Sequence, residues 1–246
     1  MIKTIAAGIR LITAASVTLL FVSCHTKIDF SNGIDGNGNV VTQTRNVGNN
    51  FSKIEVKRGL IVTLEQSDSY SVEVEADENL QEHITVSVEN ETLIITSDKG
   101  IDEATAKTIH VKMPELTGIE ATSGSSVSTR NVFTGTDVFV KSSSGSEADL
   151  NFEIDNIRCE STSGSSLEFR GKALTFKAVS SSGSSIDARD LMVNEVTAES
   201  TSGSDINVRP ILSLNAKASS GSSIDYSGSP KSVSKEENSG GSVSKE

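Results

Sequence analysis

Apolar and small residues recur at every second position around a repeated Ser-Gly pair in the second half of the chain. The glycines of this pair are Gly124, Gly145, Gly164, Gly183, Gly203, Gly221 and Gly240. Seven, five and three residues before each glycine, and three residues after it, most side chains are apolar or small. Alternation with a period of two is typical of strands that bury one face. The pattern therefore predicts two short strands in each repeat, joined by a Ser-Gly turn.

The alternate positions are polar, and charge gathers in two of these outward columns. Four residues after the glycine stand Ser128, Asp149, Glu168, Asp187, Asn207 and Asp225. Six residues after it stand Arg130, Asn151, Arg170, Arg189, Arg209 and Ser227. If equivalent positions stack about 4.8 Å apart, an acidic column lies beside an Arg-rich one. The candidate polar contact face consists of Asp149, Glu168, Asp187, Asp225, Arg170, Arg189 and Arg209.

The length of the repeat selects the architecture. Successive glycines are 18 to 21 residues apart, which is too short for a propeller blade, and the repeat has neither a leucine-rich pattern nor a helical period. We predict an all-β chain in which residues 118–246 form a right-handed parallel β-solenoid with one coil of about 19–20 residues per repeat. Lys235 and Glu237 replace inward residues in the last copy, as expected for a polar C-terminal cap.

Residues 46–117 alternate apolar and polar residues but lack the Ser-Gly period. The predicted strands cover residues 51–57, 60–66, 70–76, 84–88, 93–97 and 108–113. We predict that antiparallel strands cap the N-terminal end of the solenoid, because an open end would expose core and strand edges. The Gly/Asn-rich residues 24–45 are interpreted as a tether.

The first 23 residues have the order of an export signal. Lys3 and Arg10 precede an apolar run, residues 11–22, that ends at Ser23-Cys24 and is too short for a good membrane span. A small residue followed by cysteine predicts a lipoprotein signal peptide with Cys24 as the acylated residue, so the membrane is a partner through this anchor. The alternative is an ordinary secreted protein with an incidental cysteine. We expect an exported protein at the outer membrane or cell surface, with a periplasm-facing position left open.

Composition narrows the possible functions. The chain has 33 Asp and Glu against 22 Lys and Arg, a formal charge of −11, whereas nucleic-acid binding needs a basic surface. The chain has three His and two Cys, which offer few ligands for a zinc site. Residues 35–39 imitate the start of a calcium loop, but Val40 and Asn46 stand where such a loop needs Gly and Glu. We expect no metal, no cofactor and no nucleic-acid partner.

Isolated residues of chemical interest have structural interpretations. Cys159 falls in an inward column between Val140 and Ala178, so we expect a small buried side chain rather than a reactive thiol. His83 and His110 are interpreted as exposed strand residues. Ser-x-x-Lys occurs twice in the Ser/Lys/Glu-rich tail, without the companion motifs of a serine enzyme.

Catalysis requires a separate test, because parallel β-helices often carry polysaccharide lyases and hydrolases. Such sites use carboxylate clusters or a Lys/Arg base, and Asp149, Glu168 and Asp187 could imitate a carboxylate pair. An active site is a local exception to a repeat, whereas this column is the repeat itself. We therefore predict a structural charge ladder and no enzyme.

Several segments resemble one family of exported bacterial proteins, described as "putative auto-transporter adhesin, head GIN domain". The segments are residues 36–45 (Gly-Asn-Gly-Asn-Val-Val-Thr-Gln-Thr-Arg), 51–59 (Phe-Ser-Lys-Ile-Glu-Val-Lys-Arg-Gly), 74–80 (Val-Glu-Ala-Asp-Glu-Asn-Leu), the Ser-Gly-Ser coils and 226–231 (Tyr-Ser-Gly-Ser-Pro-Lys). The resemblance covers residues 36–246 and implies an all-β fold with a β-helical half. It also implies adhesion, often on lipoproteins of the Bacteroidota, and brings no accepted catalytic residues.

Together these features predict a non-enzymatic envelope or cell-surface lipoprotein. It would be an adhesin-like binding module that presents a rigid, repeated polar face to a glycan or a surface protein. The alternatives are a structural spacer or assembly protein and, from another class, a glycan-processing β-helix enzyme.

Overall fold

The computed structural model describes residues 33–246, which form one compact unit, Gly33–Glu246. The predicted signal peptide, Cys24 and the first part of the predicted tether lie outside the described residues. Within the unit, 17 strands form one continuous sheet, and the single helix is a short 3-10 turn, Glu78–Leu80. None of the helical structure between residues 33 and 246 could span a membrane. The predicted all-β class is confirmed.

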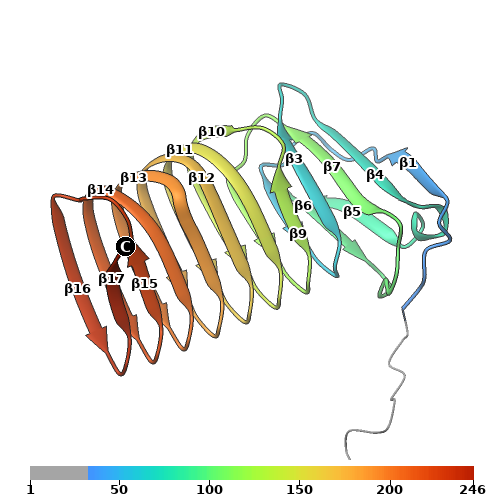
Figure 1. Ribbon diagram of the computed structural model, residues 1–246. Coiled ribbons are helices and arrows are strands. Elements are labelled where there is room, and N and C mark those ends of the chain that lie inside the picture. Colours follow the sequence, from blue (N-terminus) through green and yellow to red (C-terminus); the bar gives the residue numbers. More distant parts are fainter. Residues whose placement is uncertain (1–32) are drawn as a thin grey trace, which may run out of the picture. The chain divides into compact units, whose positions relative to one another are not determined.

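The Ser-Gly repeats form the predicted parallel β-solenoid (Figure 1). Its strands are β8 (Gly118–Ala121), β9 (Ser126–Thr129), β10 (Phe133–Ser142), β11 (Glu147–Ser161), β12 (Ser166–Ser180), β13 (Ser185–Thr201), β14 (Asp205–Ser219), β15 (Ser223–Tyr226), β16 (Ser232–Asn238) and β17 (Ser242–Lys245). Each of β11 to β14 runs from one Ser-Gly corner to the next. On one side, the first part of β11 pairs with β9 and its second part with β10, and β14 divides in the same way between β15 and β16. The segments before the corners form one face, here called the pre-corner face, and the segments after them form the post-corner face.

The predicted inward columns are in register. Cys159 pairs with Val140 on one side and with Ala178 on the other, and all three are buried. On the post-corner face, Leu167 lies between Ala148 and Ile186 in the same way. Because equivalent residues stack from coil to coil, these rows form a continuous core, which also contains the fully buried rings of Phe133, Phe152, Phe169 and Phe176.

Each Ser-Gly corner is a tight turn with two consecutive left-handed residues. The serine has φ of 49° to 58° and the glycine φ of 68° to 79° in all seven copies, as a type I′ turn requires. The serine that follows the glycine turns inward. Ser146 Oγ lies 2.7 Å from the carbonyl oxygen of Ala121 in the preceding coil, and Ser184 Oγ lies 2.7 Å from that of Ser161. This row of buried hydroxyls satisfies carbonyl groups that would otherwise lack partners.

One coil of the solenoid comes from the N-terminal region and is inserted out of sequence order. Strands β2 (Lys53–Val56) and β3 (Ile61–Gln66) pair in parallel with β8 and β9 on one side. On the other side they pair in parallel with β6 (Thr92–Ser97) and β7 (Lys107–Met113). Their connection, Arg58-Gly59, has φ of 61° and 69°, and the Gly59 amide donates to Ser123 O at 2.9 Å.

The cap is consequently mixed rather than wholly antiparallel. Antiparallel pairing is confined to β5 (Ile84–Glu89) on β6, to β4 (Ser71–Asp77) on β7 and to β1 (Val40–Thr44) on β4. Strand β1 lies within residues 24–45, which the sequence predicts to be a tether, but it belongs to the sheet. The cap is mixed because the 53–66 coil pairs in parallel with the exposed edges of β8 and β9 and, on its other side, with β6 and β7. Only the strands beyond β6 and β7 run antiparallel to their neighbours.

The C-terminal end has the polar character that the sequence predicts. Lys235 Nζ donates to the carbonyl oxygen of Val243 at 2.8 Å and lies 5.0 Å from the centre of the Tyr226 ring. Glu237 accepts a hydrogen bond from the Val243 amide at 2.6 Å. These two charged residues therefore link β16 to β17, and they make the last coil a poor surface for further stacking.

Candidate functional site

The acidic column of the post-corner face stacks as predicted. Asp149 pairs with Glu168, Glu168 with Asp187, and Asn207 with Asp225. The same row continues through Ser128 into the out-of-order coil at Thr63, then to His110, Glu73 and Thr44. A single line of outward polar side chains therefore crosses the whole described unit.

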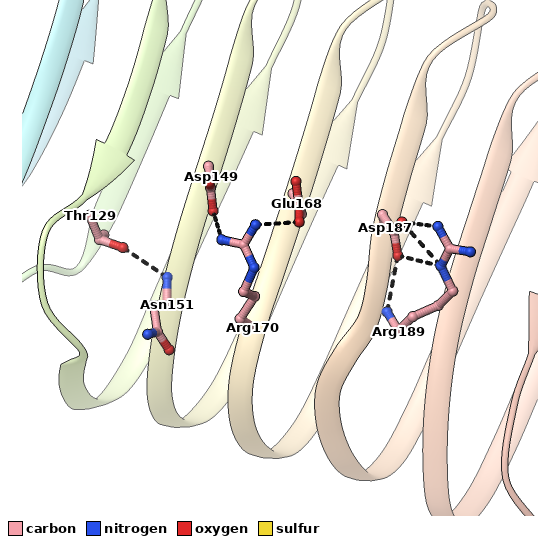
Figure 2. Close-up of polar contacts among 7 residues, drawn as sticks. All are labelled: Thr129, Asp149, Asn151, Glu168, Arg170, Asp187 and Arg189. Carbon is pink, nitrogen blue, oxygen red and sulfur yellow. Dashed lines mark hydrogen bonds and ion pairs between the residues drawn. The ribbon is translucent and has the colours of Figure 1, made fainter.

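Two arginines neutralise the central part of this column. The Arg170 guanidinium lies between Asp149 and Glu168 and pairs with both, the distance from Nη2 to Glu168 Oε1 being 2.5 Å (Figure 2). Arg189 turns back onto Asp187 of its own strand, with Nη2 2.5 Å from Oδ2. Hydrogen bonding by Arg189 lowers the pKa of Asp187. Asp225 and Arg209 form no ion pair within residues 33–246.

The predicted stacking of Arg170, Arg189 and Arg209 is wrong. Arg170 pairs with Asp190 rather than Arg189, and Arg209 pairs with Met192. The interval from Gly183 to Gly203 is 20 residues, against 19 before it and 18 after it, so the register shifts near Arg189 and Asp190. The bulge places the extra residue at the surface, and a column counted from the glycine is therefore valid only up to that point.

The face can make polar contacts, but its geometry does not favour acid–base catalysis. Glu168, Asp187, Arg189 and Asp190 line a hollow of about 370 Å³. A general acid needs a raised pKa, whereas the pKa of Asp187 is lowered by its arginine partner. Among residues 33–246, no group of three or more His, Cys, Asp or Glu side chains is placed to hold a metal ion.

The structure also shows the surroundings of Cys159, His83 and His110. Cys159 is a free thiol with 1% exposure, and burial raises its pKa well above the usual range, so its predicted burial is confirmed. His83 and His110 are partly buried rather than exposed, because each contacts a carboxylate: Asp98 at 3.0 Å and Glu75 at 2.9 Å. His83 lies in a turn before β5 rather than in a strand.

Two of the segments that carry the family resemblance, residues 36–45 and 74–80, meet at the N-terminal edge. The buried Asp77 carboxylate accepts hydrogen bonds from the amides of Gly38 at 2.9 Å and Ala106 at 3.0 Å. The hydrogen bond from Gly38 is the largest cause of its lowered pKa. A Cβ on Gly36 would lie 1.9 Å from Asp77 Oδ2. These motif residues thus fasten β1 to the sheet.

A second polar surface, which the columns of the repeat do not predict, lies on the pre-corner face. Lys53, Phe139, Arg158, Glu160 and Lys177 line a groove of about 580 Å³. The signal was present as exceptions in the outward columns. Phe139 stands six residues before its glycine among polar residues, and Val179 interrupts a column of Glu and Lys four residues before the glycine.

Comparison with known proteins agrees with the fold. A putative adhesin from Bacteroides fragilis NCTC 9343 has a TM-score of 0.80 and 23% identity, over 87% of this chain and 100% of that one. A putative adhesin from Parabacteroides merdae ATCC 43184 has a TM-score of 0.68 and 18% identity, over 87% and 99%. A protein named "Putative lipid binding protein", from Parabacteroides distasonis ATCC 8503, has a TM-score of 0.69 and 22% identity, over 87% and 99%.

A search of curated proteins finds no match. The family model described as "Putative auto-transporter adhesin, head GIN domain" matches residues 50–230, which span the out-of-order coil, the cap and most of the solenoid. The resemblance drawn from the sequence motifs is confirmed. The chain belongs to this family.

Proposed function

We propose that the protein is a non-enzymatic, adhesin-like binding module of the cell envelope, anchored through a lipid on Cys24. The observation that carries this proposal is the register of the outward rows. The acidic row crosses eleven strand segments without a break in pairing, from Thr44 on β1 to Ser244 on β17. The family's description as an adhesin supports the same role.

Stacked coils suit multivalent binding. Neighbouring residues of a row lie about 4.8 Å apart, and the strands of a coil are hydrogen-bonded to those of the coils beside it. A partner with repeated groups would therefore meet a preorganised series of equivalent contacts. Individually weak contacts add up when they are held at fixed spacing, because only the first one bears the full entropic cost of association.

Enzymatic activity has weaker support from the site. Three carboxylates of the candidate face, Asp149, Glu168 and Asp187, are paired with Arg170 or Arg189, and hydrogen bonding by Arg189 lowers the pKa of Asp187. A glycan-processing site would need a protonated acid or an unpaired base beside a second carboxylate. The repeated, neutralised row fits contact rather than bond cleavage.

Whole cells test the binding role. Cells that express the full-length chain should adhere to immobilised glycans or matrix proteins more than cells that lack it, and an external protease should cleave the chain on intact cells. Loss of envelope integrity without any difference in adherence would favour the structural-spacer alternative. An unchanged adherence together with complete protease resistance would contradict a surface adhesin.

The anchor has its own test. Replacing Cys24 with Ala should release the protein from the membrane fraction, because acyl chains hold a lipoprotein by about 0.8 kcal/mol for each buried methylene. Cys159→Ala is the matched control, since this buried thiol lies in the solenoid core. A Cys24→Ala variant that still fractionates with membranes would contradict the lipoprotein assignment.

A further inference from the structure

The groove on the pre-corner face gathers side chains from neighbouring strands that are distant in sequence. Lys53 on β2 pairs with Gly118 on β8, and Gly118 pairs with Phe139 on β10. Arg158 on β11 and Lys177 on β12 continue the same outward row. The out-of-order coil therefore supplies one end of a groove of about 580 Å³ whose other end is made by the regular coils.

The groove is basic although the chain has a formal charge of −11. Lys53, Arg158 and Lys177 form no side-chain hydrogen bond or ion pair within residues 33–246, whereas other cations of this face are paired. Lys141 lies 3.3 Å from Glu120, and Lys217 lies 3.2 Å from Glu236. Glu160 is the one carboxylate that lines the groove. Three unpaired cations thus leave a local excess of positive charge that a bound anion would balance.

An exposed aromatic ring lies in the middle of this basic row. Phe139 has 37% of its surface exposed, although most outward residues of the solenoid are polar. Gly118 beside it leaves space for the aliphatic part of the Lys53 side chain, because a Cβ at Gly118 would lie 3.2 Å from Lys53 Cγ. A flat apolar ring flanked by cations matches a sugar ring whose carbon–hydrogen face packs on the aromatic while its anionic substituents meet Lys and Arg.

The groove is also where the repeat is interrupted. Beyond Lys177 the same outward row returns to the small polar residues Thr197, Asn215 and Ser234. In the neighbouring row, Val179 stands between Glu160 and Glu199 and removes a charge beside Lys177. A specific binding site needs particular residues in one place, and this local exception to the repeat supplies them.

We propose that this groove binds an anionic polysaccharide, carboxylated or sulfated, with Phe139 under a sugar ring and Lys53, Arg158 and Lys177 on its anionic groups. The inference rests on the proposed binding function and gives it a ligand class. The cations follow one row of the sheet, about 4.8 Å per strand, which suits a linear polymer. An anionic bilayer is disfavoured because Phe139 is the one exposed large apolar side chain that lines the groove, whereas insertion into a bilayer surface requires a larger buried apolar area.

Binding of the purified full-length chain to polygalacturonate and to chondroitin sulfate tests the site, with neutral dextran as the comparison polymer. The parent should bind at least one anionic polymer, more weakly as salt rises. Arg158→Glu with Lys177→Glu should lower the affinity at least about tenfold, and Phe139→Ala about threefold to tenfold. The charge-matched control, Lys99→Glu with Lys231→Glu, changes exposed lysines outside the groove and should bind like the parent.

The outcomes separate this site from the broader role. Equal binding by the groove variant and the control, or no preference over dextran, would overturn the site. Binding only to vesicles that contain phosphatidylglycerol would also overturn it in favour of a lipid surface. If chain-dependent cell adherence persists while neither polysaccharide binds, the site is wrong and the adhesive function stands. If the polysaccharides bind but the chain does not change adherence, the site stands and the adhesive function fails.

Discussion

The coil made by β2 and β3 and the coils after residue 118 share one cross-section but differ in their connections. Both have two consecutive left-handed residues at the corner, Arg58-Gly59 in one and Ser-Gly in the others. The later coils mostly stack on their sequence neighbours. The β2–β3 coil instead lies between strands that follow it by tens of residues. The turn geometry therefore requires neither a serine nor coils that follow one another in the chain.

The residue after the glycine shows what the neighbouring coil requires. In the first six Ser-Gly corners it is a buried serine. Its hydroxyl reaches a carbonyl of the adjacent coil, as Ser125 Oγ reaches Val56 O at 3.1 Å. After Gly59 it is Leu60, which is fully buried. The coil on that side, β6–β7, joins its strands through residues 98–106 rather than through a tight corner. The serine is thus needed where one tight corner stacks on another.

The largest expected effect comes from removing a buried hydroxyl from a regular corner. Ser184→Ala should cost about 1–3 kcal/mol, because it leaves buried polar groups without partners. Ser184 Oγ contacts Ser161 O, Ser181 N, Ser181 O and Ser180 Oγ. Ser125→Ala, at the junction with the out-of-order coil, should cost less, since Ala121 takes the place of the second serine. Denaturant unfolding measures both, and Ser182→Gly at an exposed left-handed position is the control. A harmless Ser184→Ala would contradict the hydroxyl ladder.

A smaller effect tests whether the two kinds of corner are equivalent. Gly59 and Gly183 have φ of 69° and 68°, and a Cβ would meet no atom closer than 3.6 Å at the first and none within 4 Å at the second. Each Gly→Ala change should therefore cost about 1–2 kcal/mol, the penalty of a left-handed L-residue. Unequal losses of unfolding free energy would show that the corners are not the same turn.

Acidification should affect the N-terminal region first. The pKa of Asp77 is lowered chiefly by the hydrogen bond from the Gly38 amide. Its ionised form stabilises the fold above the unfolded-state value of about 3.9, and this contribution is lost as the pH falls through the lower folded-state value. The unfolding midpoint of Asp77→Asn should consequently fall less than that of the parent between pH 7 and pH 3. Asp155→Asn, at an exposed carboxylate that forms no side-chain hydrogen bond or ion pair within residues 33–246, is the control, and an equal response in the two variants would contradict this role of Asp77.

The charged face of the solenoid should tolerate neutralisation better than reversal. Asp187→Asn removes one exposed ion pair and should cost about 0–1 kcal/mol. Arg170→Glu should cost more, because Asp149 and Glu168 would both face a new carboxylate. Thermal unfolding at low and high salt measures the difference, which should shrink as salt increases. A large loss in Asp187→Asn would mean that this residue has a role beyond surface pairing.

The smallest expected effect is a gain. Arg58 has φ of 61°, a left-handed conformation that Asn adopts more readily than Arg. Arg58→Asn should therefore stabilise the protein by a few tenths of a kcal/mol. Its exposed side chain leaves no core contact to lose, so a clear destabilisation would point to an undetected role for the guanidinium.

Particular residues show where the repeat predicts side-chain positions correctly and where it does not. Cys159 and Ile186 were placed inside because a period of two holds along any strand with one buried face. Asp149, Glu168 and Asp187 were aligned because the repeat length is constant up to that point. Arg189 and Arg209 were misaligned because an extra residue forms a surface bulge, which hydrophobic alternation does not reveal.

Local patterns in the sequence specify the corners, the inward rows and the outward rows before the bulge, since these depend on turn geometry and on a repeated alternation. The position at which the β2–β3 coil is inserted, and hence its neighbours, depends on tertiary pairing. Parallel pairing joins strands that are far apart in the chain, and many equivalent edges could accept the same apolar pattern. The meeting of Lys53 with Phe139, Arg158 and Lys177 follows from that choice of edge, so the exceptions in the repeat could indicate the solenoid part of the groove but not the contribution of Lys53.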